Sequence, residues 1–140
     1  MSDENLFDGA AVEKLRKLGG DEFVRRMIDM FFDYAPKRVA AARAGEQAGD
    51  LAAIAKAVHP LKSSAGQIGA RGMQELCSQL EKLAMDNQAG PIPPLLDQLE
   101  AALAQIRPLL EQARNPTQQS ITLSPLQPSS PGFPSGEGEA

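Results

Sequence analysis

The chain has 140 residues, with 14 Lys and Arg against 18 Asp and Glu, and its formal net charge of −4 argues against a general nucleic-acid-binding protein, which needs a basic surface for phosphates. No apolar run approaches the roughly 20 residues that cross a bilayer, and the first ten residues lack the basic start and apolar stretch of a signal peptide. We therefore expect one soluble domain in the cytoplasm, without a membrane anchor.

Apolar residues recur at spacings of three and four from Asp8 to Arg114, which predicts helices throughout this part of the chain. Asp8 is expected to cap a short first helix that stops at Gly19 and Gly20, and Asp21 is expected to cap the second. The apolar positions of the first helix are Val12, Leu15 and Leu18, and those of the second are Val24, Met27, Ile28, Phe31, Ala35, Val39 and Ala42. Pro36 lies inside the second run and predicts a bend.

A third helix is expected from Leu51 to about Ile68, capped by Asp50 and followed by a turn at residues 69–72. Its buried positions are expected to be Leu51, Ile54, Ala55, Val58, Leu61, Ala65 and Ile68. A fourth helix follows, with Met73, Leu76, Cys77, Leu80, Leu83 and Ala84 on one face. Three prolines between residues 91 and 94 then open a fifth helix, because proline is tolerated in a first turn, and Pro108 should bend or weaken the last part of that helix.

No segment shows the alternation of apolar and polar residues that is typical of a strand, and the short connections after residue 50 favour antiparallel neighbours. The sequence therefore predicts an all-α protein: an antiparallel up-and-down four-helix bundle over residues 1–114, with the short N-terminal helix laid against it. Residues 115–140 contain five prolines and no Lys or Arg, so we expect a flexible Pro/Ser/Gly-rich tail. Because no hydrophobic seam is left over, we expect a monomer.

The only histidine, His59, lies roughly 120° from the centre of the apolar stripe of its helix, and so faces outward. Ser63 lies beside it on the same face, and Lys62 lies between it and the edge of the core. His59 and Glu81 are each eleven residues from Ala70, at the centre of the turn, so antiparallel packing brings them to the same height. A carboxylate on one ring nitrogen would leave the other free as a nucleophile. An ordinary surface histidine is the competing interpretation.

The residues that metal binding and nucleotide binding require are missing from the sequence. One His, one Cys and scattered carboxylates make no credible set of metal ligands, and Cys77 lies on an apolar stripe, where it is expected to pack in the core. The phosphate-binding and dinucleotide-binding glycine motifs are missing, so we expect no nucleotide site, no cofactor and no enzyme in the usual sense. A hydrolase that uses Ser63 and His59 stays open, and requires a pocket of roughly 300 Å³ beside His59.

The run His59-Pro60-Leu61-Lys62, followed by small residues and by Gly69-Ala70, resembles the signature of the histidine-containing phosphotransfer (HPt) domain family. The resemblance extends to residues 18–23 and 34–36 upstream and to residues 76–81 downstream, and it covers about residues 6–114. It implies a carrier in a two-component phosphorelay. His59 would accept a phosphoryl group from a receiver-domain aspartate or a histidine kinase and pass it to the aspartate of a response-regulator receiver.

The same resemblance implies roles for the neighbours of His59. Lys62 would lie near the phosphoryl group, and Glu81 stands where the family has a Gln or Glu that contacts the ring. Ser63 stands in place of the usual glycine, whose small size lets a partner approach, and Gln67 stands where Asn is common. Pro60 occupies a variable position and frees the carbonyl of Lys56, one turn before His59.

The implied partners are receiver domains and a hybrid or other sensor histidine kinase, with Mg²⁺ expected on the receiver and no cofactor on this chain. We expect docking on the second and third helices around His59, through apolar side chains off the core stripe and through nearby cations and amides. The candidate residues are Phe23, Met30, Phe32, Lys56, Gln67 and Arg71. The alternative function is a non-phosphorylated helical adaptor that binds or inhibits kinases or receivers and needs no chemistry at His59.

Overall fold

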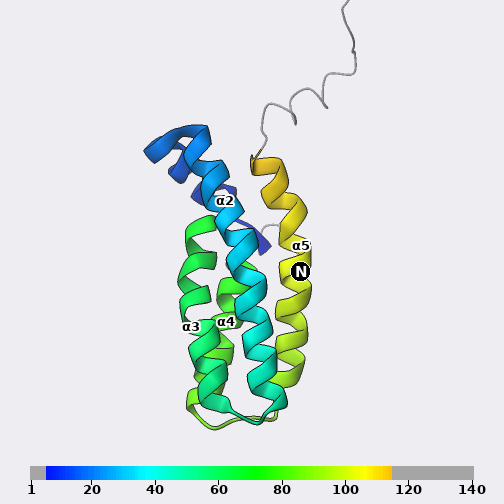
Figure 1. Cartoon of the computed structure of the whole chain (residues 1–140). Helices are drawn as coiled ribbons and strands as arrows, with labels where there is room; N and C mark the ends of the chain where they lie inside the picture. The colour runs from blue at the N-terminus through cyan, green and yellow to red at the C-terminus, as the bar shows by residue number, and fades with distance from the viewer. Residues whose placement is uncertain (1–5, 115–140) are drawn as a thin grey trace, which may run out of the picture.

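The computed structural model describes residues 6–114, which form four helices that run up and down beside one another (Figure 1). The helices are α2 (Gly9–Gln47), α3 (Leu51–Ile68), α4 (Arg71–Met85) and α5 (Ile92–Arg114). α3 packs between α2 and α4, and α5 packs against α2 and α4 on the other side, which closes the bundle. The all-α bundle expected from the sequence is confirmed. Within the described residues no helix is long and apolar enough to span a membrane.

The first two predicted helices are one element, α2, with a kink where the sequence predicts a stop. Gly20 has φ 84° and ψ −176°, a conformation that favours glycine, and the segment before it turns across the end of the bundle (Figure 1). The ring of Phe23 lies over Gly19, where an added Cβ would come within 2.5 Å of it. Leu18, assigned from its spacing to the apolar face, is instead 76 % exposed, because the kink carries it away from the core.

Side-chain caps fix two of the helix starts as the sequence predicts. The Asp8 carboxylate accepts a hydrogen bond from the Ala10 N–H at 3.1 Å, and that of Asp50 accepts one from the Ala53 N–H at 3.1 Å. The turn between α3 and α4 is shorter than predicted, because it consists of Gly69, with φ 87°, and Ala70, and α4 already begins at Arg71. The predicted tail, residues 115–140, lies outside the described residues.

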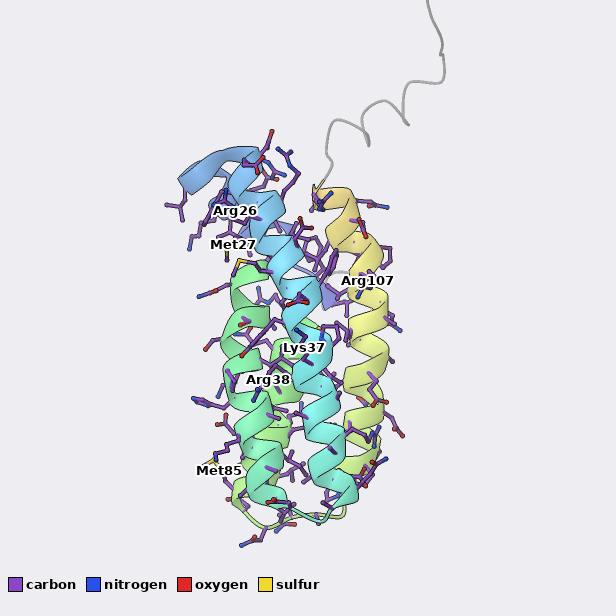
Figure 2. The ribbon with its side chains drawn as sticks, in the orientation of Figure 1. Arg26, Met27, Lys37, Arg38, Met85 and Arg107 are labelled. Atoms are coloured by element: carbon purple, nitrogen blue, oxygen red, sulfur yellow. The ribbon has the colours of Figure 1, made fainter. Side chains whose placement is uncertain are left out.

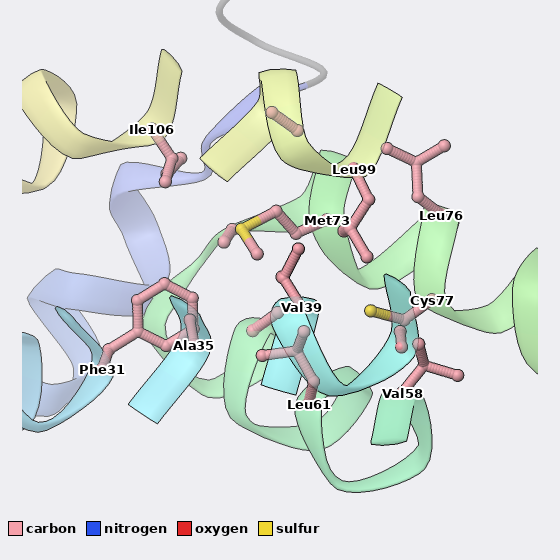
Figure 3. Packing of buried hydrophobic residues seen from close by; sticks show 14 of the residues in the cluster. Phe31, Ala35, Val39, Val58, Leu61, Met73, Leu76, Cys77, Leu99 and Ile106 are labelled. Carbon is pink, nitrogen blue, oxygen red and sulfur yellow. The ribbon is translucent and has the colours of Figure 1, made fainter. Parts of the chain in front are cut away.

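The core is a continuous apolar cluster to which all four helices contribute (Figure 3). Cys77 is buried within it, as predicted, and burial raises the pKa of its thiol to about 12. The thiol is therefore uncharged at neutral pH and acts as a small apolar side chain. Pro36, Pro60 and Pro108 all lie inside helices of this bundle, so each removes one backbone donor from its helix.

We predict that Gly69→Ala destabilises the fold by at least about 1–2 kcal/mol, the cost of a left-handed conformation for a residue with a Cβ. The added methyl group would also clash with the Asp8 carbonyl, which packs against this turn. Urea unfolding measures the change. Gly90→Ala is the matched control, since no atom lies within 4 Å of the added Cβ. Equal free energies of unfolding for the two variants would contradict the prediction.

Candidate functional site

His59 projects from the outer face of α3, with its side chain 68 % exposed. Its Nδ1 lies 2.6 Å from Oε2 of Glu81 on α4, and the other oxygen of the same carboxylate, Oε1, accepts a hydrogen bond from Lys62 Nζ at 2.7 Å. One carboxylate thus binds both functional groups of α3. The predicted register between His59 and Glu81 is confirmed by this contact.

The charge of Glu81 decides which ring nitrogen carries the proton. The hydrogen bond from Lys62, and to a smaller extent that from His59, holds the pKa of Glu81 below its ordinary value, against the opposing effect of its partial burial. Glu81 is therefore a carboxylate at neutral pH and can only accept hydrogen bonds. It follows that Nδ1 donates, and that Nε2 of the neutral ring carries a free lone pair and points away from Glu81.

Two different depressions adjoin this site. One, of about 610 Å³, includes His59 and Glu81 and has a largely apolar lining of Leu51, Ala52, Ala55, Lys56, Ala84, Met85 and Asn87. The other, of about 880 Å³, includes Lys62, Ser63 and Arg71 but not His59. The depression beside His59 exceeds the roughly 300 Å³ that a hydrolase requires. Ser63 does not line it, however, which argues against a hydrolase that would need both side chains in one pocket.

The candidate docking residues of α2 fall on two sides of that helix. Arg38 bonds to the backbone of α3, and Met27 lies on the same side, toward α3 (Figure 2). Helical spacing places Phe23 and Met30 nearer to this side. Phe32 instead lies under the guanidinium of Arg107 from α5, whose carbon is 4.6 Å from the ring centroid. Phe32 therefore faces α5 and is not adjacent to His59.

The remaining docking candidates lie at increasing distance from His59. Lys56 is exposed and lines the same depression as His59. Gln67 lies two turns farther along α3, about 12 Å along the axis, beside the N-terminal segment of α2. Arg71 bonds to Asp8 at 3.2 Å, at the same end of the bundle. Of the three, the structure brings only Lys56 into contact with the depression beside His59.

Apolar residues beside His59 were missed by the sequence reasoning. Met85 is 70 % exposed and lies one turn after Glu81, and Ala55 lies one turn before His59. The same antiparallel register that pairs His59 with Glu81 could have placed both of them at this seam. Within residues 6–114 no group of three or more His, Cys, Asp or Glu side chains could hold a metal ion.

Comparison with known proteins gives a consistent family. The family model described as "Hpt domain" matches residues 26–114. The crystal structure of histidine-containing phosphotransfer protein B (HptB) from Pseudomonas aeruginosa PAO1 is similar, with a TM-score of 0.75 and 28 % sequence identity, over 81 % of this chain and 97 % of that one. No curated protein sequence matches the chain. With a family match over more than half of its length, the chain belongs to the Hpt domain family, and its role is histidine phosphotransfer in two-component signalling.

Proposed function

We propose that this chain is a monomeric, cytoplasmic phosphorelay carrier whose phosphoacceptor is His59. It would take the phosphoryl group from a receiver aspartate or a histidine kinase and pass it to a response-regulator receiver. The observation that supports this most strongly is the exposed imidazole whose Nδ1 is bound to Glu81, because that bond leaves Nε2 as an oriented nucleophile.

In the proposed step, the Nε2 lone pair forms a bond to phosphorus as the bond from phosphorus to the aspartyl oxygen of the donor breaks. The departing aspartate keeps the electron pair. The ring, still protonated at Nδ1, becomes positively charged, and the Glu81 carboxylate 2.6 Å from Nδ1 stabilises that charge. Phosphoryl transfer passes through a loose transition state, so such positioning and charge neutralisation provide most of the catalysis.

Lys62 lies three residues after the acceptor on α3, and in the free protein it is bound to the same carboxylate of Glu81 that binds His59. Its side chain is one third exposed and lies one turn after His59, so it can reach the outer face of the helix. We propose that Lys62 turns toward the phosphoryl oxygens when they arrive, because three new negatively charged oxygens attract it more than a carboxylate already shared with His59.

The partner would dock around His59 on both of its flanks. The apolar depression with Leu51, Ala55 and Met85 continues directly from the ring, and Lys56 at its edge complements an acidic receiver site. Phe23 and Met30 would extend this surface onto α2, and Ser63 is small enough to permit approach on the other flank. Gln67 and Arg71 would contact only the outer part of a large partner, and Phe32, which packs under Arg107 of α5, would lie outside this docking surface. Mg²⁺ would belong to the receiver.

We predict that His59→Gln abolishes phosphorylation by a phosphorylated receiver panel from the source organism, whereas the wild-type chain gains an acid-labile label. Acid lability follows from the phosphorus–nitrogen bond. Radiolabel transfer at neutral pH and after acid treatment measures both properties. A His59→Gln protein that still accepts phosphate would defeat the assignment. A wild-type chain that binds receivers but never becomes labelled would support the adaptor instead.

Lys62→Ala should slow phosphotransfer by about tenfold or more, equivalent to about 1.4 kcal/mol of transition-state stabilisation, because the arriving charge loses the ammonium group that Glu81 holds beside His59. Rapid-quench kinetics measure the rate, and thermal unfolding checks that the fold is kept. Lys82→Ala is the matched control, since Lys82 is exposed on α4 and pairs only with Asp86 among the described residues. Equal rates for the two variants would remove the proposed role of Lys62.

The Glu81 contacts also predict a pH dependence of stability. Because the pKa of Glu81 is lowered in the folded state, its contribution is complete above the ordinary value of 4.5 and is lost as the pH falls through the folded pKa. The wild-type chain should therefore exceed Glu81→Gln in free energy of unfolding at pH 6, and the difference should shrink at pH 3. Urea unfolding at the two pH values measures it, and a difference that grows in acid would contradict the assigned charge state.

A further inference from the structure

Pro60 leaves one backbone acceptor of α3 without its helical donor, next to the phosphoacceptor. Proline has no N–H, so the carbonyl of Lys56, four residues earlier, lacks the donor that an α-helix normally provides. The proline ring also crowds that carbonyl, which weakens the helix at this turn. His59 lies inside this turn, so the direction of its side chain depends on how the backbone of this turn is held.

Arg38 of α2 supplies the missing donor. Its Nη2 donates to the Lys56 carbonyl at 2.9 Å, and its Nε donates to the Ala57 carbonyl at 3.1 Å. The two acceptors are consecutive along α3, and the rigid guanidinium fork matches their spacing. Arg38 is half-buried where α2 meets α3 (Figure 2), so this contact also fixes the turn of α3 before Pro60 to the neighbouring helix.

The carbonyls freed by the other two helical prolines have no such side-chain donor among the described residues. Pro36 frees the carbonyl of Phe32, and Pro108 frees that of Ala104. Within residues 6–114, no side chain donates a hydrogen bond to either of these carbonyls. The carbonyl that Pro60 frees, by contrast, accepts one from the guanidinium group of Arg38. A free carbonyl on an outer face can bind water, so a dedicated donor beside His59 points to a need for fixed geometry there.

We propose that Arg38 is a positioning residue for His59. It replaces the donor that Pro60 removes, and it holds this turn of α3 in place so that Nδ1 meets the Glu81 carboxylate and Nε2 faces outward. The 2.6 Å contact tolerates little displacement, since a hydrogen bond is lost when its atoms move apart by about 1 Å. The consequence for phosphotransfer rests on the proposed function of His59, but the consequence for the ring geometry does not.

The test is a double-mutant cycle between Arg38 and Pro60 in the full chain. The rate readout is labelling of His59 by phosphoramidate, in which the Nε2–P bond forms, the P–N bond of the donor breaks and ammonia leaves. This small donor removes any effect of partner docking. The second readout is the ¹⁵N NMR signature of the single histidine, which reports the fraction of neutral ring protonated at Nδ1.

Arg38→Met should lower the labelling rate by about tenfold, because a misplaced nucleophile loses proximity, and should also lower the Nδ1-protonated fraction. Arg38→Lys should recover part of both, since an ammonium group can still donate to one carbonyl. In a Pro60→Ala background the restored N–H satisfies the Lys56 carbonyl, so Arg38→Met should then change the rate by less than about twofold. Arg25→Met is the matched control, because Arg25 lies on α2 and pairs with Glu22.

Equal losses in the wild-type and Pro60→Ala backgrounds would overturn the proposal, since Arg38 would then act by another route. So would an unchanged rate and tautomer in Arg38→Met itself. If phosphoramidate fails to label the wild-type chain at His59, the proposed function fails, and the NMR cycle alone still decides the role of Arg38. Unfolding in urea shows whether a variant has lost its fold, in which case Arg38→Lys provides the comparison.

Discussion

The interaction on which the site depends is the Glu81 carboxylate shared between His59 and Lys62. One oxygen fixes the proton of the imidazole on Nδ1, and the other holds the ammonium group close to the face where a phosphoryl group would arrive. The lowered pKa of Glu81 keeps the carboxylate charged at neutral pH, so both contacts persist together. A histidine without such a partner could present either nitrogen to solvent, and only one of them would be a well-directed nucleophile.

The rest of the bundle serves to hold α3 and α4 in one register. The left-handed Gly69 and the following Ala70 reverse the chain between α3 and α4, so His59 and Glu81, equally distant from the turn, come to the same height. The apolar core beneath them has no charged member among the described residues, and Cys77 belongs to it as a neutral side chain. Arg38 adds a link from α2 at the point where Pro60 weakens α3. Rigid placement suits phosphoryl transfer, in which positioning and charge neutralisation provide most of the catalysis.

Much of this could be predicted from the sequence, because it depends on local rules. Each of these features depends on a single short stretch of the sequence: the caps at Asp8 and Asp50, the helical spacing, and the equal distance of His59 and Glu81 from the turn. The exposure of Leu18 could not, since it depends on the direction of the kink at Gly20. The sequence also could not predict that Phe32 faces α5, because a helical wheel does not say whether α3 or α5 lies on a given side of α2. The ion pair between Lys62 and Glu81 could not be predicted, because which carboxylate Lys62 binds depends on how the helices pack.

The central claim is that Glu81 binds Nδ1 and thereby makes Nε2 the nucleophile. The most direct measurement is to locate the phosphoryl group on the ring of the phosphorylated chain, by ³¹P and ¹⁵N NMR at alkaline pH, where the phosphorus–nitrogen bond survives. The account predicts phosphorus bonded to Nε2, with Nδ1 still facing Glu81. Phosphorus bonded to Nδ1 would contradict it, because that nitrogen could not carry the group and the Glu81 hydrogen bond at once.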